Sequence, residues 1–343
     1  MTQHTARPYW ISLIILLLAL LISVLVGSVF ISPAALADMI RSAIQGNVST
    51  LDPNGTFASI LLQLRLPRTI LLLLVGASLA GSGAAYQGLF RNPLADPFMI
   101  GVSSGAGMGA VVAMTIQWPY TTLGLMAVPI AAFAGASLSV FVVAQLARVG
   151  KTIPTTNLIL AGVAVSAFTS AITSLLMINS SGELRRAIVW LMGGSTLSGW
   201  GPVLGVLPYA VIGLVVLLLL GHPLNVLQFG DEQAQQLGIP VQKIRLAIIL
   251  AATLATAAAV AFAGVIGFVG LVVPHIIRIL WGGDYRRLLP LSMIGGASLL
   301  LITDVAARTL TAPQEIPVGI ITALLGAPFF LWVLKRSKSQ NYW

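Results

Sequence analysis

The side chains that could carry out catalysis are few in this sequence of 343 residues. It contains no cysteine and three histidines, His4, His222 and His275. The lack of cysteine excludes a disulfide framework, a thiolate nucleophile and a cysteine-ligated metal, and the histidines show no metal-ligand spacing. His275 follows Pro274, so it more simply marks an irregular helix than a catalytic base. Because no serine elbow or HExxH motif occurs either, we predict no catalytic site, no metal site and no cofactor bound by this chain.

One segment, residues 150–152 (GKT), resembles the end of a phosphate-binding loop but lacks the rest of it. Such a loop needs a glycine five residues before its Gly-Lys pair and follows a β-strand. Gln145 occupies that position, and a long apolar run precedes it. The segment is therefore predicted to be a basic turn, and any ATP hydrolysis must belong to another chain.

The composition indicates which kind of secondary structure the chain forms. Apolar residues make up 57% of the chain and charged residues 8%, with a mean hydropathy of +0.98. A soluble domain carries roughly 25% charged residues, so this chain could not cover a water-facing surface. A membrane β-barrel would show alternation over about ten residues instead of unbroken apolar runs. The sequence predicts an all-α polytopic membrane protein, and its scattered Lys and Arg residues argue against nucleic-acid binding.

Ten apolar runs, separated by Pro, Gly and charged clusters, are predicted to form ten transmembrane helices in a single domain spanning residues 1–343. A hydrocarbon core of about 30 Å needs roughly 20 apolar residues per helix. The predicted helices are residues 9–31, 66–89, 97–117, 123–146, 156–178, 202–220, 245–264, 266–281, 288–308 and 316–334. The first exceeds the ~7–15 apolar residues of a signal peptide and is interpreted as a retained helix. The run 266–281 is short and Gly-rich, which favours a tilted or broken helix, and residues 187–197 are predicted to form a partial helix at the outer face.

Ten crossings place both termini on one side of the membrane, and the distribution of basic residues indicates which side. With the termini inside, twelve of the 18 Lys and Arg residues are cytoplasmic and six are external, as the positive-inside rule requires. Both termini are therefore predicted to be cytoplasmic. Helices 2–5 and 7–10 would then have opposite orientations, an arrangement typical of the inverted repeats of transporters.

Small residues recur at helical spacing in the second predicted helix, at Gly76, Ala80, Gly83 and nearby positions. Small residues three or four apart let membrane helices approach closely. We interpret this stripe as a packing surface.

Five further segments are unusual for plain membrane helices. They are Arg65–Arg68 (RLPR), Arg91–Pro97 (RNPLADP), Leu224–Pro240 (LNVLQFGDEQAQQLGIP), Gly264–Arg278 (GVIGFVGLVVPHIIR) and Glu315–Leu331 (EIPVGIITALLGAPFFL). Together, in this order and from about residue 60 to 334, they resemble the FecCD-type permeases, the membrane subunits of ABC importers for ferric siderophores, haem and cobalamin.

The resemblance implies a type II ABC importer permease in a bacterial cytoplasmic (inner) membrane. Its partners would be a second copy of the chain or a close paralogue, two ABC ATPase subunits that bind ATP and Mg, an extracytoplasmic substrate-binding protein, and the lipid bilayer. Transport would proceed by alternating access along the dimer axis, and the binding protein would select the cargo.

The resemblance also assigns roles to the external arginines. Arg65, Arg68 and Arg308 would receive acidic residues of the binding protein, because guanidinium–carboxylate pairs can be bidentate and give orientation. Other interpretations remain open from the residues alone. The arginines could pair with Glu315 or lipid phosphate, or simply lie at the membrane boundary, and Asp304 and Arg308 could form an i,i+4 pair.

On the cytoplasmic side, the segment 222–241 matches the coupling helices that sit in a cleft of the ATPase. The apolar and polar residues expected to act there are Leu224, Leu227, Asp231, Glu232, Gln236, Leu237 and Gly238. An amphipathic helix in a groove needs this combination of apolar anchors and polar flanks. The alternative is a free, solvated loop.

The resemblance further places a cytoplasmic gate at Asn92 and Leu94, after the second helix, and at Thr155 and Thr156, before the fifth. The simpler interpretation is that Asn92 forms a turn and that the threonines cap a helix. Both interpretations can hold together.

Among function classes, the sequence favours an importer of an iron chelate, either a ferric siderophore or haem, with cobalamin as the alternative cargo. An ion-coupled secondary transporter is less favoured, because no carboxylate falls near the membrane midplane. An intramembrane enzyme lacks a catalytic set.

Overall fold

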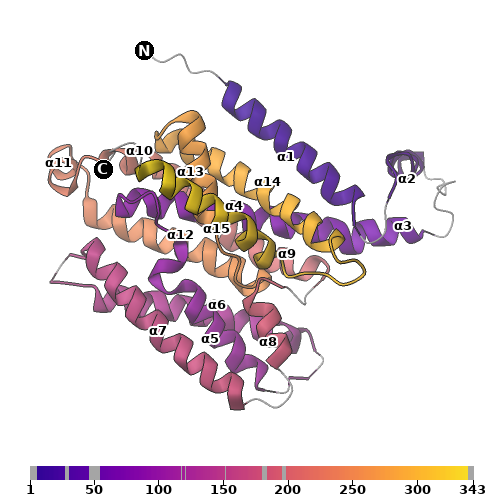
Figure 1. The fold of residues 1–343 in the computed structure, drawn as a ribbon, viewed down its shortest axis with the longest axis horizontal. Coiled ribbons are helices and arrows are strands. Elements are labelled where there is room, and N and C mark those ends of the chain that lie inside the picture. Colours follow the sequence, from indigo (N-terminus) through magenta and orange to yellow (C-terminus); the bar gives the residue numbers. More distant parts are fainter. Residues whose placement is uncertain are drawn as a thin grey trace.

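The computed structural model describes residues 6–27, 31–45, 55–116, 118–119, 121–150, 152–179, 184–194 and 198–338, and it is almost entirely helical (Figure 1). Its elements in chain order are α1 (Arg7–Leu25), α2 (Pro33–Gln45), α3 (Thr56–Ser59), the π-helical η1 (Ile60–Arg65), α4 (Leu66–Phe90), the 3-10 turn η2 (Pro97–Ile100), α5 (Val102–Met114), α6 (Thr122–Leu146), α7 (Thr155–Asn179), α8 (Leu184–Leu191), α9 (Trp200–Leu219), α10 (Gly221–Leu227), α11 (Asp231–Gln236), α12 (Val241–Ala263), α13 (Val269–Trp281), α14 (Tyr285–Thr309) and α15 (Val318–Lys338). The described ranges contain no strand.

Seven described helices are long and apolar enough to cross a membrane: α1, the continuous α3–η1–α4 helix, α6, α7, α9, α12 and α14. Three shorter apolar helices, α5, α13 and α15, complete the set. Each of the ten predicted segments overlaps one of these helices, so the prediction of an all-α membrane protein is confirmed.

Several predicted helix limits were wrong, each for a local reason. The first helix ends at Leu25, because Val26 is extended; positions 28–30 of the predicted span lie outside the described residues. The predicted helix 97–117 is interrupted at Gly101, which has a φ of 85° and separates η2 from α5; residue 117 is also outside the described part. The second helix begins at Thr56, ten residues earlier than predicted, and passes through η1 before Pro67.

Two irregular segments agree with the sequence. Residues 264–268 are not helical and α13 begins only at Val269, as the broken-helix interpretation of 266–281 requires. The partial helix expected within 187–197 corresponds to α8, which ends at Leu191; residues 195–197 lie outside the described ranges.

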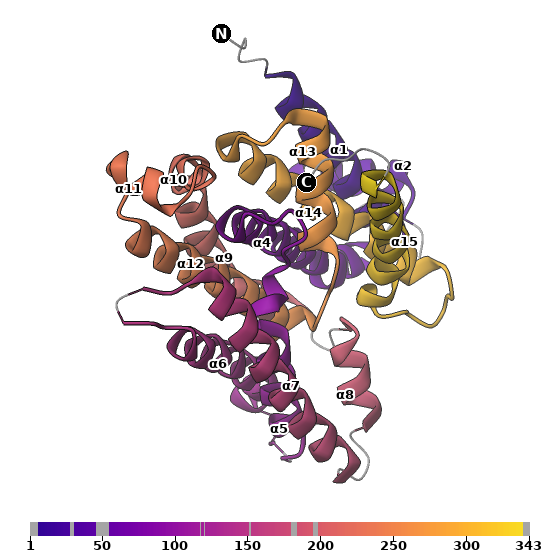
Figure 2. The same cartoon turned by 60° about the vertical axis from the view of Figure 1, so that its left-hand side comes forward.

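Helix α4 is the centre of the bundle and is surrounded by α9, α12, α13 and α14 (Figure 2). Nearly all of its side chains are buried from Leu71 onward. A Cβ atom on Gly76 would collide with the backbone oxygen of Gly296 in α14, and one on Gly83 with the backbone oxygen of Gly270 in α13. The predicted packing role of this small-residue stripe is therefore confirmed, since these helices approach to backbone contact.

The outer helices, by contrast, expose large apolar side chains. Phe168 of α7 is 68% exposed and Leu331 of α15 is 65% exposed. In a membrane protein such faces contact lipid or another subunit. The start of α1, the end of α15, and helices α10 and α11 lie toward the left of Figure 1, and α2, α3 and the turn between α14 and α15 lie toward the right.

We expect Gly83→Val to destabilise the protein by about 3 kcal/mol, because the added methyl groups cannot fit against the backbone of α13. Thermal unfolding in detergent would measure the effect. Gly267→Ala is the matched control, since no atom lies within 4 Å of a Cβ built there. Equal midpoints for the two variants would contradict this account of the packing.

Candidate functional site

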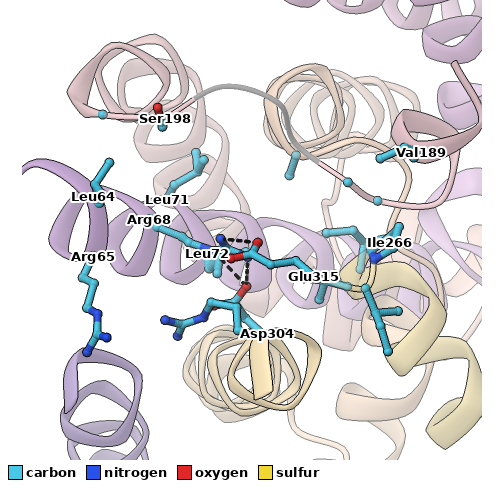
Figure 3. Close-up of a pocket in the computed structure, with 18 of the residues that line it drawn as sticks. Leu64, Arg65, Arg68, Leu71, Leu72, Val189, Ser198, Ile266, Asp304 and Glu315 are labelled. Atoms are coloured by element: carbon cyan, nitrogen blue, oxygen red, sulfur yellow. Dashed lines mark hydrogen bonds and ion pairs between the residues drawn. The ribbon is translucent and has the colours of Figure 1, made fainter. Parts of the chain in front are cut away.

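The end of the bundle that the sequence predicts to face outward contains a cavity of about 460 Å³ with a charged wall (Figure 3). Arg65 and Arg68 reach it from the end of η1 and the start of α4, Asp304 and Arg308 from the last turns of α14, and Glu315 from the turn before α15. Apolar side chains and the Gly193–Gly194 segment form the remaining walls. The tertiary structure thus brings together the three arginines that were predicted to be external.

Asp304 organises this charge cluster. Its side chain has no exposed surface, and its Oδ1 accepts hydrogen bonds from Arg68 Nε at 3.0 Å and Nη2 at 2.8 Å. Its Oδ2 lies 2.8 Å from Nε of Arg308, the i,i+4 pair that the spacing favoured. Arg68 also donates through Nη1 to Glu315 at 2.8 Å, and Figure 3 shows these three side chains facing one another. A buried carboxylate is stable here because two guanidinium groups neutralise it.

Arg65 and Arg308 serve a second purpose, which the sequence did not indicate. Arg65 Nη1 donates to the backbone oxygens of Val24 at 2.6 Å and Leu25 at 2.9 Å, and Arg308 Nη2 donates to that of Ser23 at 3.2 Å. These oxygens lie at the end of α1, where the helix leaves carbonyl groups unpaired. The two arginines therefore cap α1 and hold it against α4 and α14.

This geometry changes what the docking prediction requires. Arg65 and Arg308 are each 6% exposed, whereas the side chains of Arg68 and Glu315 are 35% and 47% exposed. Within this cluster, Arg68 and Glu315 are the two residues that present substantial charged surface. Docking through all three arginines stays a prediction, with Arg68 as the residue placed for direct contact.

The predicted coupling segment folds into two short helices, α10 and α11, and not a free loop. Leu224 and Leu227 are buried in the core of the chain, while Phe229 and Leu237 are 66% and 65% exposed. Glu232, Gln236 and Gly238 are exposed too. Leu224 and Leu227 thus anchor α10 to its own subunit, and the residues available to a partner are those from Phe229 onward, on and beside α11.

Side-chain hydrogen bonds attach α10 to two transmembrane helices. Asn225 Nδ2 donates to Asp284 Oδ1 at 2.6 Å, and Asn225 Oδ1 accepts from the backbone N–H of Tyr285 at 2.8 Å, at the start of α14. Gln228 Nε2 donates to the backbone oxygen of Gly88, near the end of α4, at 3.0 Å. A displacement of α10 must therefore reach α4 and α14.

Asp284 is the N-cap of α14 and accepts hydrogen bonds from both the backbone and the guanidinium of Arg286. The Arg286 guanidinium, together with Asn225, holds the pKa of the Asp284 carboxyl well below its usual range. The ionised form is thus bound more strongly in the folded state than in the unfolded chain.

The predicted gate residues lie at the same end of the bundle as α10. Asn92 Oδ1 accepts a hydrogen bond from the N–H of Leu94 at 2.9 Å, so the turn interpretation of this segment is confirmed. Thr155 and Thr156 begin α7, which packs on η2 through contact of Gly162 with the backbone of Met99. A gating role for the four residues stays a prediction.

The chain is similar to a known family along most of its length. The profile of the FecCD transport family matches residues 15–336. The chain belongs to the FecCD transport family. Family membership, predicted above from five segments, is confirmed, and the chain is an ABC transporter permease and a multi-pass membrane protein.

Three FecCD relatives indicate the range of the family. A cobalamin import system permease protein, BtuC of Halobacterium salinarum, is 49% identical over 273 residues, 79% of this chain and 72% of its own length. The hemin transport system permease protein HmuU of Yersinia pestis is 42% identical over 302 residues, 86% and 88% of the two chains. The vitamin B12 import system permease protein BtuC of Escherichia coli is 40% identical over 332 residues, 94% and 93% of the two chains.

The FecCD chain also resembles a solved ABC transporter of metal-chelate type in an inward-facing conformation. The TM-score is 0.79 at 32% identity, with 96% of this chain and 98% of the other covered. Among the described residues, no three His, Asp or Glu side chains are grouped so as to hold a metal ion.

Replacing the buried carboxylate should weaken the outer cluster strongly. We expect Asp304→Asn to destabilise the protein by about 3–5 kcal/mol, because two guanidinium groups lose their buried partner. Glu315→Gln, at a half-exposed position, should change stability by less than about 1 kcal/mol. Thermal unfolding of both variants in detergent tests this; a larger loss for the Glu315 variant would contradict it.

The low pKa of Asp284 predicts a specific pH dependence. Stability from this group is present above its unfolded pKa of about 3.9 and is lost as the pH falls toward the lower folded pKa. We expect Asp284→Asn to reduce the drop in unfolding midpoint between about pH 6 and pH 3. Glu232→Gln, at an exposed carboxylate on α11, is the control and should leave that drop unchanged.

Proposed function

We propose that this FecCD permease is the membrane-spanning subunit of an ATP-driven importer for a metal chelate, with both termini in the cytoplasm and the chain in the bacterial cytoplasmic membrane. The observation that carries the proposal is the construction of α10 and α11. Their inner side is buried and hydrogen-bonded to α4 and α14, while Phe229 and Leu237 remain exposed. An exposed apolar pair on a firmly attached base is what a force-transmitting contact needs.

The energy source in this proposal is a pair of separate ATPase subunits that bind ATP and Mg at the cytoplasmic face. Exposed Glu232, Gln236 and Leu237 would contact them directly. Leu224, Leu227 and Asp231 would support the contact from within the chain. A second copy of the chain, or a close paralogue, would complete the translocation path against the exposed faces of outer helices such as α7 and α15.

At the opposite end, the charge cluster offers a docking point for an extracytoplasmic binding protein. Arg68 is held rigidly by Asp304 and Glu315 yet keeps a third of its side chain exposed. Charges on the rim of an interface raise the encounter rate and fix orientation. Arg65 and Arg308 would contribute by holding α1 and the cluster in place.

For the cargo we favour a metal tetrapyrrole, meaning a corrin such as cobalamin or a haem. The relatives at 49% and 42% identity carry names for cobalamin and hemin import. A ferric siderophore, the cargo favoured by the family resemblance alone, is the second candidate. All three are large and rigid, so a path that binds them weakly would suffice if a binding protein selects them.

Uptake measurements would identify the cargo. Radiolabelled cobalamin, haem and a ferric siderophore would be offered separately to cells with and without the gene for this chain. We expect deletion to abolish uptake of a tetrapyrrole, and reintroduction of the gene to restore it. Loss of siderophore uptake alone would replace the favoured cargo, and unchanged uptake of all three would contradict the proposal.

The docking role predicts a separable effect of one arginine. We expect Arg68→Gln to weaken binding of the cognate binding protein by about tenfold, the cost of one charge-assisted contact of about 1.4 kcal/mol. Arg41→Gln is the control, since Arg41 lies on exposed α2 outside the cluster. Surface-immobilised transporter titrated with the binding protein gives both affinities, and equal values would contradict docking at Arg68.

A further inference from the structure

Arg245, in the first turns of α12, is buried although it is cationic. Its side chain is 5% exposed, whereas Lys243, two residues earlier, is exposed. A buried guanidinium is retained only where partners satisfy its charge and its N–H groups. Its two partners come from segments far apart in the sequence, and both belong to the proposed transport machinery.

The first partner is the coupling segment. Arg245 Nη2 donates to Asp231 Oδ2 at 2.7 Å, at the start of α11. Asp231 Oδ1 also lies 4.0 Å from Nη2 of Arg91, directly before the predicted gate residue Asn92. Asp231 was predicted to flank a contact with the ATPase, but the structure places its carboxylate against this chain's own arginines.

The second partner is the segment before α7. Arg245 Nη1 donates to the backbone oxygen of Ile153 at 2.8 Å. The backbone N–H of Ile153 donates to Gln242 Oε1 at 3.2 Å. Both backbone groups of Ile153 are therefore bonded to the first two turns of α12. Ile153 precedes Thr155 and Thr156 by two and three residues.

One planar side chain therefore connects α11 to the beginning of α7. In both ribbon views, α11, the start of α12 and the connection between α6 and α7 lie along the same edge of the molecule (Figures 1 and 2). Glycines with positive φ, Gly230 at 108° and Gly238 at 82°, form the turns on either side of α11, and the ion pair ties α11 to α12. A guanidinium can bond two groups in a fixed geometry, which a lysine cannot do.

We propose that Arg245 is a positioning residue that transmits displacement of α11 to the gate at Thr155 and Thr156. This inference rests on the proposed function and on the predicted gate, and it adds the route by which the coupling segment acts. When the ATPase subunits move α11, Asp231 moves Arg245, and Arg245 moves the backbone of Ile153. Neither Arg245 nor Asp231 needs to touch the cargo.

A single cysteine can report the movement, because the chain contains none. Thr156→Cys would be introduced into the full transporter, assembled with its ATPase subunits in liposomes. The rate of alkylation by a small maleimide would be compared without nucleotide and with ATP trapped by vanadate. We expect the two rates to differ about fivefold or more, the lower end of usual coupling between sites.

Two variants break the connection and one serves as a matched control. Arg245→Gln removes both bonds, and Asp231→Asn leaves the bond to Ile153 but removes the ion pair to α11. Lys243→Gln removes one positive charge from the same turn of α12. We expect the nucleotide-dependent rate difference to disappear in Arg245→Gln and Asp231→Asn while ATP hydrolysis continues. The difference should persist in Lys243→Gln. Asp231→Glu, which keeps the carboxylate, should retain part of it.

The outcomes separate this inference from the proposed function. If Arg245→Gln fails to assemble, Asp231→Asn decides the result, because Asp231 is partly exposed and Arg245 keeps its hydrogen bond to the backbone oxygen of Ile153. A nucleotide-dependent difference that survives Asp231→Asn would overturn the positioning role. So would a parent protein that imports cargo but shows no difference at position 156. Absence of ATP-driven import by the parent would instead contradict the proposed function.

Discussion

Backbone-to-backbone contact around α4 is the constraint on which the rest of the structure depends. In lipid, helices gain little from burying apolar side chains against one another, so association depends on close packing. Gly76 and Gly83 allow α14 and α13 to reach the backbone of α4. With α4 fixed in this way, the outer charge cluster at its start and the hydrogen bond to Gly88 near its end acquire defined positions.

Charge is placed at the two ends of this packed centre, and in each case an arginine joins elements that are distant in sequence. At one end, Arg68 connects α4 to Asp304 of α14, and Arg65 caps α1. At the other end, Arg245 connects α11 to the segment before α7. A guanidinium suits both tasks because its several N–H groups can bond carboxylate and carbonyl oxygens at once.

The long helix α14 passes from one of these regions to the other. Its first turn is fixed by Asp284 and Asn225, at the coupling segment, and its last turns carry Asp304 and Arg308. A helix held by side-chain bonds at both ends is suited to relate events at the two ends of the bundle.

The sequence by itself determined the class of the protein: ten apolar segments, the small-residue stripe of α4, and five segments sufficient to identify the family. These signals are local, since they depend on composition and spacing along the chain. Only the tertiary structure decided which charges meet. The sequence predicts an exposed docking role for Arg65 and no particular role for Arg245, yet both are buried. Their partners are the carbonyls of Val24, Leu25 and Ile153 and the carboxylate of Asp231, which come from other elements. Backbone acceptors carry no sequence signal, so such contacts become visible only when the helices are packed.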